Sequence, residues 1–112
     1  MTTPTPKRRS VTPRMIADVL DGAYDVLDTE GWARGDLALE SLLHGTGPCC
    51  AGVAICRAAR TLGLPAYPAL RAVAAHVGDT VPSWNDRQKS PSKVLRVLER
   101  VADAYRAKEN RR

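Results

Sequence analysis

Apolar residues recur at helical spacing along most of the chain. The clearest stretch follows Thr12, which suits a helix N-cap, with Pro13 at the first helical position, and it ends at Gly31. Its apolar residues lie three or four positions apart, as on one face of a helix: Ile16, Leu20, Ala23 and Leu27. Residues 13–30 are therefore predicted to form an amphipathic helix.

The same signals predict four more helices, over residues 37–44, 48–62, 68–77 and 91–106. The last of these has Ser90 as its N-cap and Pro91 at its first position. Its apolar stripe consists of Val94, Leu98, Val101 and Tyr105. The segment between the last two helices, residues 79–89, is predicted to be a loop.

The predicted helix over residues 48–62 is apolar nearly all round. Its only charged residues are Arg57 and Arg60, and small side chains fill most other positions. A helix without a polar face is typical of the centre of a bundle, where small residues let neighbouring helices approach closely. Cys49 and Cys56 are seven positions apart, so we expect them on one face as small buried residues.

The composition favours the same architecture. The 112 residues include no Phe and only two Trp, which is typical of helices packed through aliphatic side chains rather than of a sheet. We therefore predict an all-α protein, a compact bundle of four to five short helices around a central apolar helix. One domain over residues 12–106 would follow a disordered basic arm, residues 1–11, and precede a frayed basic tail, residues 107–112.

Charge is unevenly distributed along the chain. The net charge is +5, made up of +4 in residues 1–14, −6 in residues 15–45 and +7 in residues 46–112. The basic parts suit an acidic partner or nucleic acid, or else the acidic and basic segments lie against each other. Four aspartates share one stripe of the first helix and are expected to form a solvated or salt-bridged face: Asp18, Asp21, Asp25 and Asp28.

The cysteines and histidines fit neither a disulfide framework nor a zinc site. Three cysteines are an odd number, and no targeting or membrane-spanning segment stands out, so we expect reduced thiols and a cytoplasmic protein. Zinc needs four well-spaced ligands, but there is no C-x-x-C pair. The available residues are His44, Cys49, Cys50, Cys56 and His76. Neither a metal nor another cofactor is expected.

Cys50 is the candidate nucleophile. A helix N-terminus favours a thiolate, and His76 and Asp86 follow in the order of a Cys-His-acid triad. The run CAGVA, the later GLP and the triplet from His76 to Gly78 resemble the cell-wall hydrolase family of papain-like cysteine peptidases. In that family the histidine lies on a strand, whereas His76 falls in a predicted helix. A buried thiol and a histidine that caps a helix C-terminus are therefore the favoured interpretation.

Helix-turn-helix DNA binding is the main alternative function. Residues 56–73, CRAARTLGLPAYPALRAV, resemble that motif, with Gly63 at the turn. Tyr67 and Arg71 would be the polar residues that read bases. Phosphate contacts would come from the basic arm and the last helix, through Lys7, Arg8, Arg9, Lys89, Lys93, Arg96 and Arg100.

Two short motifs resemble those of a small uncharacterised family of actinobacteria and their phages. Residues 29–35, TEGWARG, look like its GW-x-x-G element, and residues 83–86, SWND, with the helix that follows, look like its WND ending. Where that family opens its middle helix with a Trp-Cys pair, this chain has Cys49 and Cys50. The resemblance covers about residues 15–105. It implies an all-helical single domain without an established activity.

The resemblance singles out Gly31, Trp32, Gly35, Cys50, Trp84, Asn85 and Asp86. Physical reasoning makes most of them structural, with the two indoles filling the core and the Asn-Asp pair serving as turn or cap groups. The alternative is that they form a binding surface, made of Trp32, Trp84, Asn85 and Asp86.

We therefore predict a small non-enzymatic accessory or interaction protein of actinobacterial or phage type. It would bind a protein partner or a second copy of itself, because no convergent set of polar groups predicts a metabolite site. DNA binding is the alternative, and a thiol hydrolase comes third.

Overall fold

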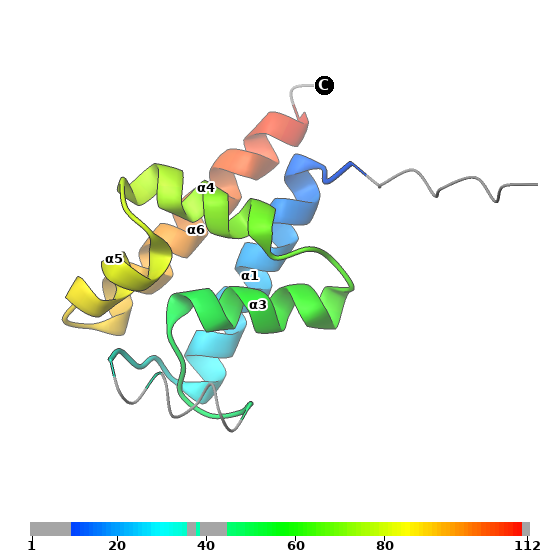
Figure 1. Cartoon of the computed structure of the whole chain (residues 1–112). Helices are drawn as coiled ribbons and strands as arrows, with labels where there is room; N and C mark the ends of the chain where they lie inside the picture. The colour runs from blue at the N-terminus through cyan, green and yellow to red at the C-terminus, as the bar shows by residue number, and fades with distance from the viewer. Residues whose placement is uncertain (1–9, 36–37, 39–44, 111–112) are drawn as a thin grey trace, which may run out of the picture.

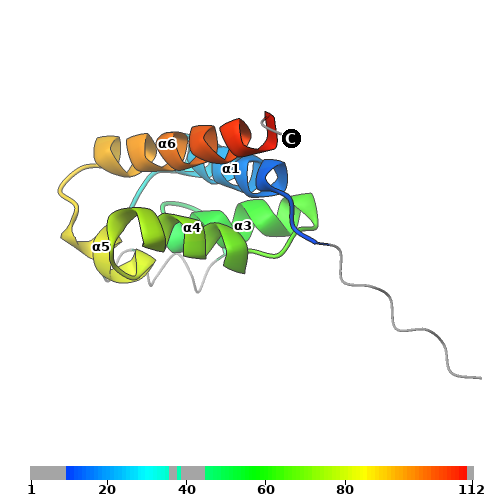
Figure 2. The same ribbon diagram turned by 90° about the horizontal axis from the view of Figure 1, so that it is seen from above.

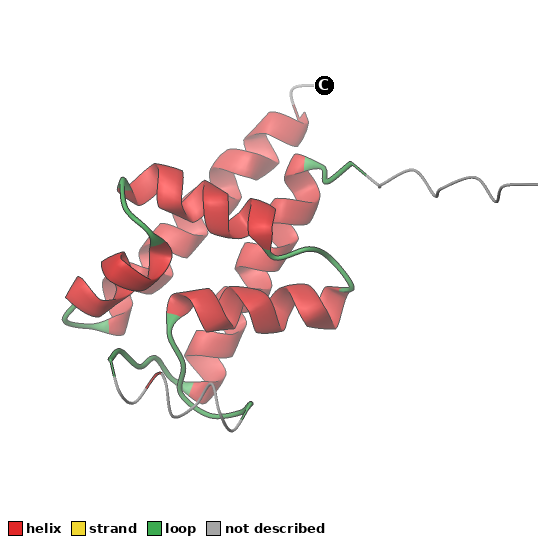
Figure 3. Cartoon of the chain, viewed as in Figure 1, coloured by secondary structure: helices red, strands yellow, loops and turns green. Residues whose placement is uncertain are grey.

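The computed structural model describes residues 10–35, 38 and 45–110, and these residues form five helices and no strand. The helices are α1 (Pro13–Glu30), α3 (Ala51–Leu62), α4 (Tyr67–Val77), α5 (Val81–Arg87) and α6 (Pro91–Asn110) (Figures 1 and 3). The predicted all-α bundle is confirmed.

The helices form two layers. α1 and α6 lie side by side in one layer, and α3, α4 and α5 make up the other (Figure 2). α1 contacts α6, α3 and α4. The predicted central apolar helix, α3, contacts α1, α4 and α5.

Small residues bring α1 and α3 close together, as their sequences predict. A Cβ atom added at Gly22 of α1 would lie 2.9 Å from the Cβ atom of Ala58 in α3. The start of α1 also agrees with the prediction, because the Thr12 hydroxyl accepts a hydrogen bond from the Met15 N–H (3.2 Å). Gly31 ends the helix with a φ of 98°, which favours glycine.

α3 begins three residues later than predicted, at Ala51. The preceding residues pair instead with the connector after α1. The Cys49 N–H donates to the Gly31 carbonyl (3.2 Å), and the Ala33 N–H donates to the Cys49 carbonyl (2.9 Å). Cys49 is therefore buried but lies outside the helix, and the predicted shared face with Cys56 does not form. The prediction that Cys56 is buried was wrong, because its side chain is exposed.

Two other boundaries differ from the prediction. The segment between α4 and α6 was predicted to be a loop, but it contains α5, with Thr80 as its N-cap and Pro82 in its first turn. α6 continues past Arg106 to Asn110, where the Lys108 ammonium lies 4.2 Å from the centre of the Tyr105 ring. Favourable i, i+3 contacts of this kind extend a helix without any further burial.

The aspartate stripe of α1 is a salt-bridged and solvated face, as predicted. Asp21 pairs with Arg106 of α6, and the other three aspartates are exposed. The predicted helix over residues 37–44 lies outside the described residues except for Ala38, which is buried. Residues 1–9 of the predicted arm also lie outside them. No helix in the described part is long and apolar enough to cross a membrane.

Candidate functional site

The two sequence motifs meet at the side chain of Asn85, which is fully buried. Its Oδ1 atom accepts hydrogen bonds from the Trp32 indole N–H (2.7 Å) and the Ala51 backbone N–H (2.9 Å). Its Nδ2 atom donates to the Ala33 carbonyl (3.2 Å). Asn85 therefore joins three segments: the connector after α1, the first turn of α3, and α5.

Further contacts fix the same connector to α5. The Gly35 N–H donates to the Asp86 carboxylate (3.0 Å), and the Arg34 guanidinium donates to the Gln88 carbonyl (2.7 Å). A Cβ atom at Gly31 would lie 3.4 Å from the Pro48 ring, close to the limit for ordinary contact. The GW-x-x-G and WND motifs are thus two halves of one junction.

This junction leaves little of the motif residues for a partner. The predicted interaction surface was Trp32, Trp84, Asn85 and Asp86. Trp84 is only 7% exposed and Asn85 is fully buried, while the Trp32 N–H and the Asp86 carboxylate bind groups within the junction. These side chains join the connector after α1 to α3 and α5. This arrangement agrees with the structural interpretation of the motif residues.

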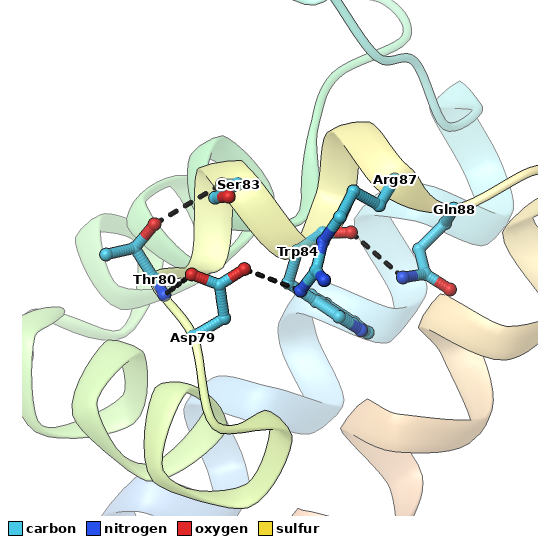
Figure 4. A network of polar contacts seen from close by, with 6 residues as sticks. All are labelled: Asp79, Thr80, Ser83, Trp84, Arg87 and Gln88. Atoms are coloured by element: carbon cyan, nitrogen blue, oxygen red, sulfur yellow. Dashed lines mark hydrogen bonds and ion pairs between the residues drawn. The ribbon is translucent and has the colours of Figure 1, made fainter.

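A second polar network holds α5 in place (Figure 4). The Thr80 hydroxyl accepts from the Ser83 N–H (3.4 Å), and the Asp79 carboxylate accepts from the Thr80 N–H (2.7 Å). Asp79 also pairs with Arg87 at the other end of the helix. The short helix is therefore fixed at both ends, and it contacts α3 and α4.

A groove opens where these three helices meet. It has a volume of about 500 Å³, and its exposed lining is almost wholly apolar. We call it the α3–α4–α5 groove. The described residues that line it are Cys50, Gly52, Val53, Cys56, Tyr67, Leu70, Arg71, Ala74, Thr80, Val81 and Pro82. Tyr67 is 67% exposed, so an aromatic ring borders an apolar hollow.

The groove exposes the side of α3 that turns away from α1. Gly52 and Val53 are half-buried and Cys56 is exposed, although the sequence of α3 is apolar on this side as well. A second hollow, of about 460 Å³, adjoins the groove, shares Val53 and Cys56 with it, and reaches Arg60 and Leu64. The uncovered side of α3 is therefore apolar along most of the helix.

The charges around the groove are mainly basic. Arg71 lines it, with its guanidinium 5.8 Å from the centre of the Tyr67 ring, and Arg60 borders the adjoining hollow. Among the described residues, neither arginine has a carboxylate partner. The nearby acids are engaged, since Glu30 pairs with Arg57 and Asp79 with Arg87.

Two of the three thiols have a pKa above the ordinary value for cysteine. Burial raises the pKa of Cys49 to about 11, and the nearby Arg57 offsets only part of this rise. Desolvation, with a smaller contribution from neighbouring Cys50, also raises the pKa of Cys56. The Cys50 sulfur caps α3 by accepting a hydrogen bond from the Val53 N–H (3.4 Å).

The residues of the predicted triad lie on three different elements. Cys50 precedes α3, His76 is exposed in the last turn of α4, and Asp86 lies on α5 with its carboxylate bound to Gly35. No hydrogen bond within the described part joins any two of the three.

The predicted nucleic-acid contacts are divided between the two layers. α3, the turn after Gly63 and α4 follow each other as in a helix-turn-helix, and Tyr67 and Arg71 are exposed on α4. The exposed basic residues of α6 lie opposite its buried stripe, in the other layer (Figure 2): Lys93, Arg96 and Arg100, with Lys89 just before the helix. Lys7, Arg8 and Arg9 lie outside the described residues.

No group of three His, Cys, Asp or Glu side chains gathers as metal ligands would, as far as the structure describes the chain. His44, one of the histidines considered for zinc, is not among the described residues. Cys50 and Cys56 both line the groove, but Cys49 faces the core.

Sequence reasoning missed the residues that form the groove floor, mainly Val53, Leu70 and Val81. The apolar sequence of α3 was a signal for the groove. A helix that is apolar nearly all round has more apolar surface than a single neighbour can cover. That signal predicted a central helix, and it could equally have predicted a helix with an open apolar side.

Comparison with known proteins identifies the family. A family of unknown function, DUF6197, matches residues 11–104, which include the connector, the groove and most of α6. Neither a curated protein nor a solved structure matches the chain. The match spans both motifs of the Asn85 junction. The chain therefore belongs to the family of unknown function DUF6197.

Proposed function

We propose that this chain is a small interaction protein that binds an amphipathic helix of a partner protein in the α3–α4–α5 groove. The observation that carries the proposal is the open apolar side of α3. Val53, Leu70 and Val81, from three different helices, line one hollow that no described element fills. Grooves lined by apolar side chains are a recurrent way to bind the apolar face of a helix.

The rim of the groove supports the same function. Tyr67 is largely exposed, and aromatic residues are enriched at protein interfaces because they bury much apolar surface at little entropic cost. α5, which contributes Val81 to the groove, is held by the hydrogen bonds of Asn85 and by the Asp79 network. A preformed site loses less freedom on binding than one that must first order.

We place the chain among non-enzymatic accessory proteins of actinobacteria or their phages, in the cytoplasm. Its motifs, which resemble those of such a family, support the origin. The apolar lining supports binding rather than catalysis, because a reaction needs converging polar groups around the substrate.

A synthetic peptide tests the groove. The probe is a fluorescent helical peptide with leucine at positions i, i+3, i+4 and i+7 and glutamine on its polar face. Its binding is measured by fluorescence anisotropy. We expect saturable binding that Val53→Asp weakens by about tenfold or more, because a carboxylate on the floor must lose its hydration. The matched control is Val26→Asp, at a half-buried valine of α1 outside the groove. Circular dichroism checks that both variants fold.

Other outcomes separate the alternatives. Equal loss of binding in Val53→Asp and Val26→Asp, or no binding by the wild type, contradicts a groove site. Sedimentation that shows a dimer broken only by Val53→Asp means that a second copy occupies the groove. Duplex DNA binding that falls steeply with salt, unaffected by Val53→Asp, favours the helix-turn-helix alternative over a peptide groove.

A further inference from the structure

We infer that the partner helix is acidic along the edge that meets Arg60 and Arg71. The inference rests on the proposed function and adds the chemical class of the partner, an acidic amphipathic helix. Its basis is the contrast between the apolar lining of the groove and the two exposed arginines beside it, which have no carboxylate partner among the described residues.

The two arginines lie at different places along the open side of α3. Arg71 projects from α4 beside the groove, and Arg60 lies near the C-terminal end of α3, where the adjoining hollow continues. Both are exposed. A helix laid over Val53 and Cys56, the residues that the two hollows share, would therefore have arginines beside it at two points.

The acidic groups near the groove do not neutralise these arginines. Glu30 pairs with Arg57 at 3.0 Å, and Asp79 pairs with Arg87. Asp86 accepts a hydrogen bond from the Gly35 N–H. Within the part of the chain that the structure describes, the charges beside the open side of α3 are therefore mainly positive, and they favour carboxylates on a ligand.

The position of Arg71 also suits recognition. Its guanidinium lies over the Tyr67 ring, one helical turn earlier on α4, and this cation–π contact restricts a long, flexible side chain. A partly ordered guanidinium loses less freedom when it forms a two-point contact with a carboxylate. The Tyr67 ring and the Arg71 head together offer an apolar surface next to a cation.

Two peptides that differ only in charge test the inference. Both carry the same leucine face, and their flanking positions are either glutamate or lysine. We expect the glutamate peptide to bind about tenfold more tightly than the lysine peptide at low salt, because each rim pair contributes a modest attraction or repulsion. Raising the salt concentration to about 0.5 M should shrink this preference.

Charge reversal on the protein sharpens the test. Arg71→Glu should remove most of the preference, and the double variant Arg60→Glu with Arg71→Glu should invert it, so that the lysine peptide binds more tightly. The matched control reverses two exposed arginines of α6, Arg96→Glu with Arg100→Glu, which changes the net charge equally. The control should keep the preference for glutamate.

The outcomes distinguish this inference from the function on which it rests. If the glutamine peptide binds but the glutamate and lysine peptides bind equally, the groove stands and the acidic partner is overturned. If the α6 control removes the preference as strongly as the groove variant, the effect reflects net charge and the inference is also overturned. If no peptide binds, the proposed function itself fails.

Discussion

The two sides of α3 are made of the same kind of residue but have different surroundings. Toward α1, Ala51, Ala54 and Ala58 are buried, and Gly22 of α1 is in close contact with Ala58. On the other side, Gly52 and Val53 line an open groove. Small apolar residues thus serve close packing on one side and leave a binding surface on the other. The difference lies in what covers each side, which composition does not reveal.

The largest expected effect on stability comes from substituting Asn85, whose hydrogen bonds hold α5 beside the open side of α3. Asn85→Ala leaves three buried polar groups without partners: the Trp32 indole N–H, the Ala51 N–H and the Ala33 carbonyl. We expect the free energy of unfolding to fall by about 3 kcal/mol or more, as measured by urea denaturation. Asp86→Ala, which removes an exposed hydrogen bond to Gly35, should cost about 1 kcal/mol or less. Equal losses would contradict the role of Asn85 as the buried junction.

A matched pair of glycine substitutions compares the two sides of α3 directly. Gly22→Ala adds a methyl group 2.9 Å from the Cβ atom of Ala58, so α1 and α3 must move apart. We expect a net destabilisation of about 1 kcal/mol, because the strain exceeds the gain in helix propensity. Gly52→Ala places its methyl group 3.8 Å from Val81, an ordinary contact, and should stabilise by up to about 1 kcal/mol. Thermal melts measure both effects. If the two substitutions change the melting temperature in the same direction, the contrast between the two sides of α3 is contradicted.

Thiol labelling offers the smallest perturbation. Cys56 is exposed at the groove, whereas Cys49 is fully buried and burial raises its pKa to about 11. At pH 8 we expect an alkylating reagent to modify Cys56 on the order of a hundredfold faster than Cys49, which reacts only when the structure opens. Mass spectrometry of digests taken over time measures both rates. Comparable rates for the two thiols would show that the junction around Cys49 is open in solution.

Local signals in the sequence predicted most helices because those signals act within a few residues. Thr12 and Pro13 start α1, and glycine ends α3 and α4 with left-handed backbone angles at Gly63 and Gly78. The helical stripes of α1 and α6 also bury most of the residues that their spacing predicts, while Ile16 and Tyr105 are partly buried. Capping and amphipathic spacing are properties of a segment alone, so no tertiary information was needed.

The features that the sequence did not predict depend on contacts between distant segments. Cys49 is extended rather than helical because it pairs with the connector after α1. α5 is short, and its place is fixed by the bonds of Asn85 to Trp32 and Ala51, which are far from it in sequence. The groove likewise exists only because α4 and α5 stop short of covering Val53. The family resemblance singled out the junction residues and Cys50, but none of the other described residues that line the groove.

The central claim is that ligands bind to the open side of α3. Its most direct test is the change in backbone amide NMR shifts as the glutamine-flanked helical peptide is added to the isotope-labelled protein. The account predicts saturable shifts at Gly52, Val53, Leu70 and Val81, with little change at Arg96 and Arg100 on the outer side of α6. Shifts concentrated on α6, or none at the groove residues at saturating peptide, would contradict it.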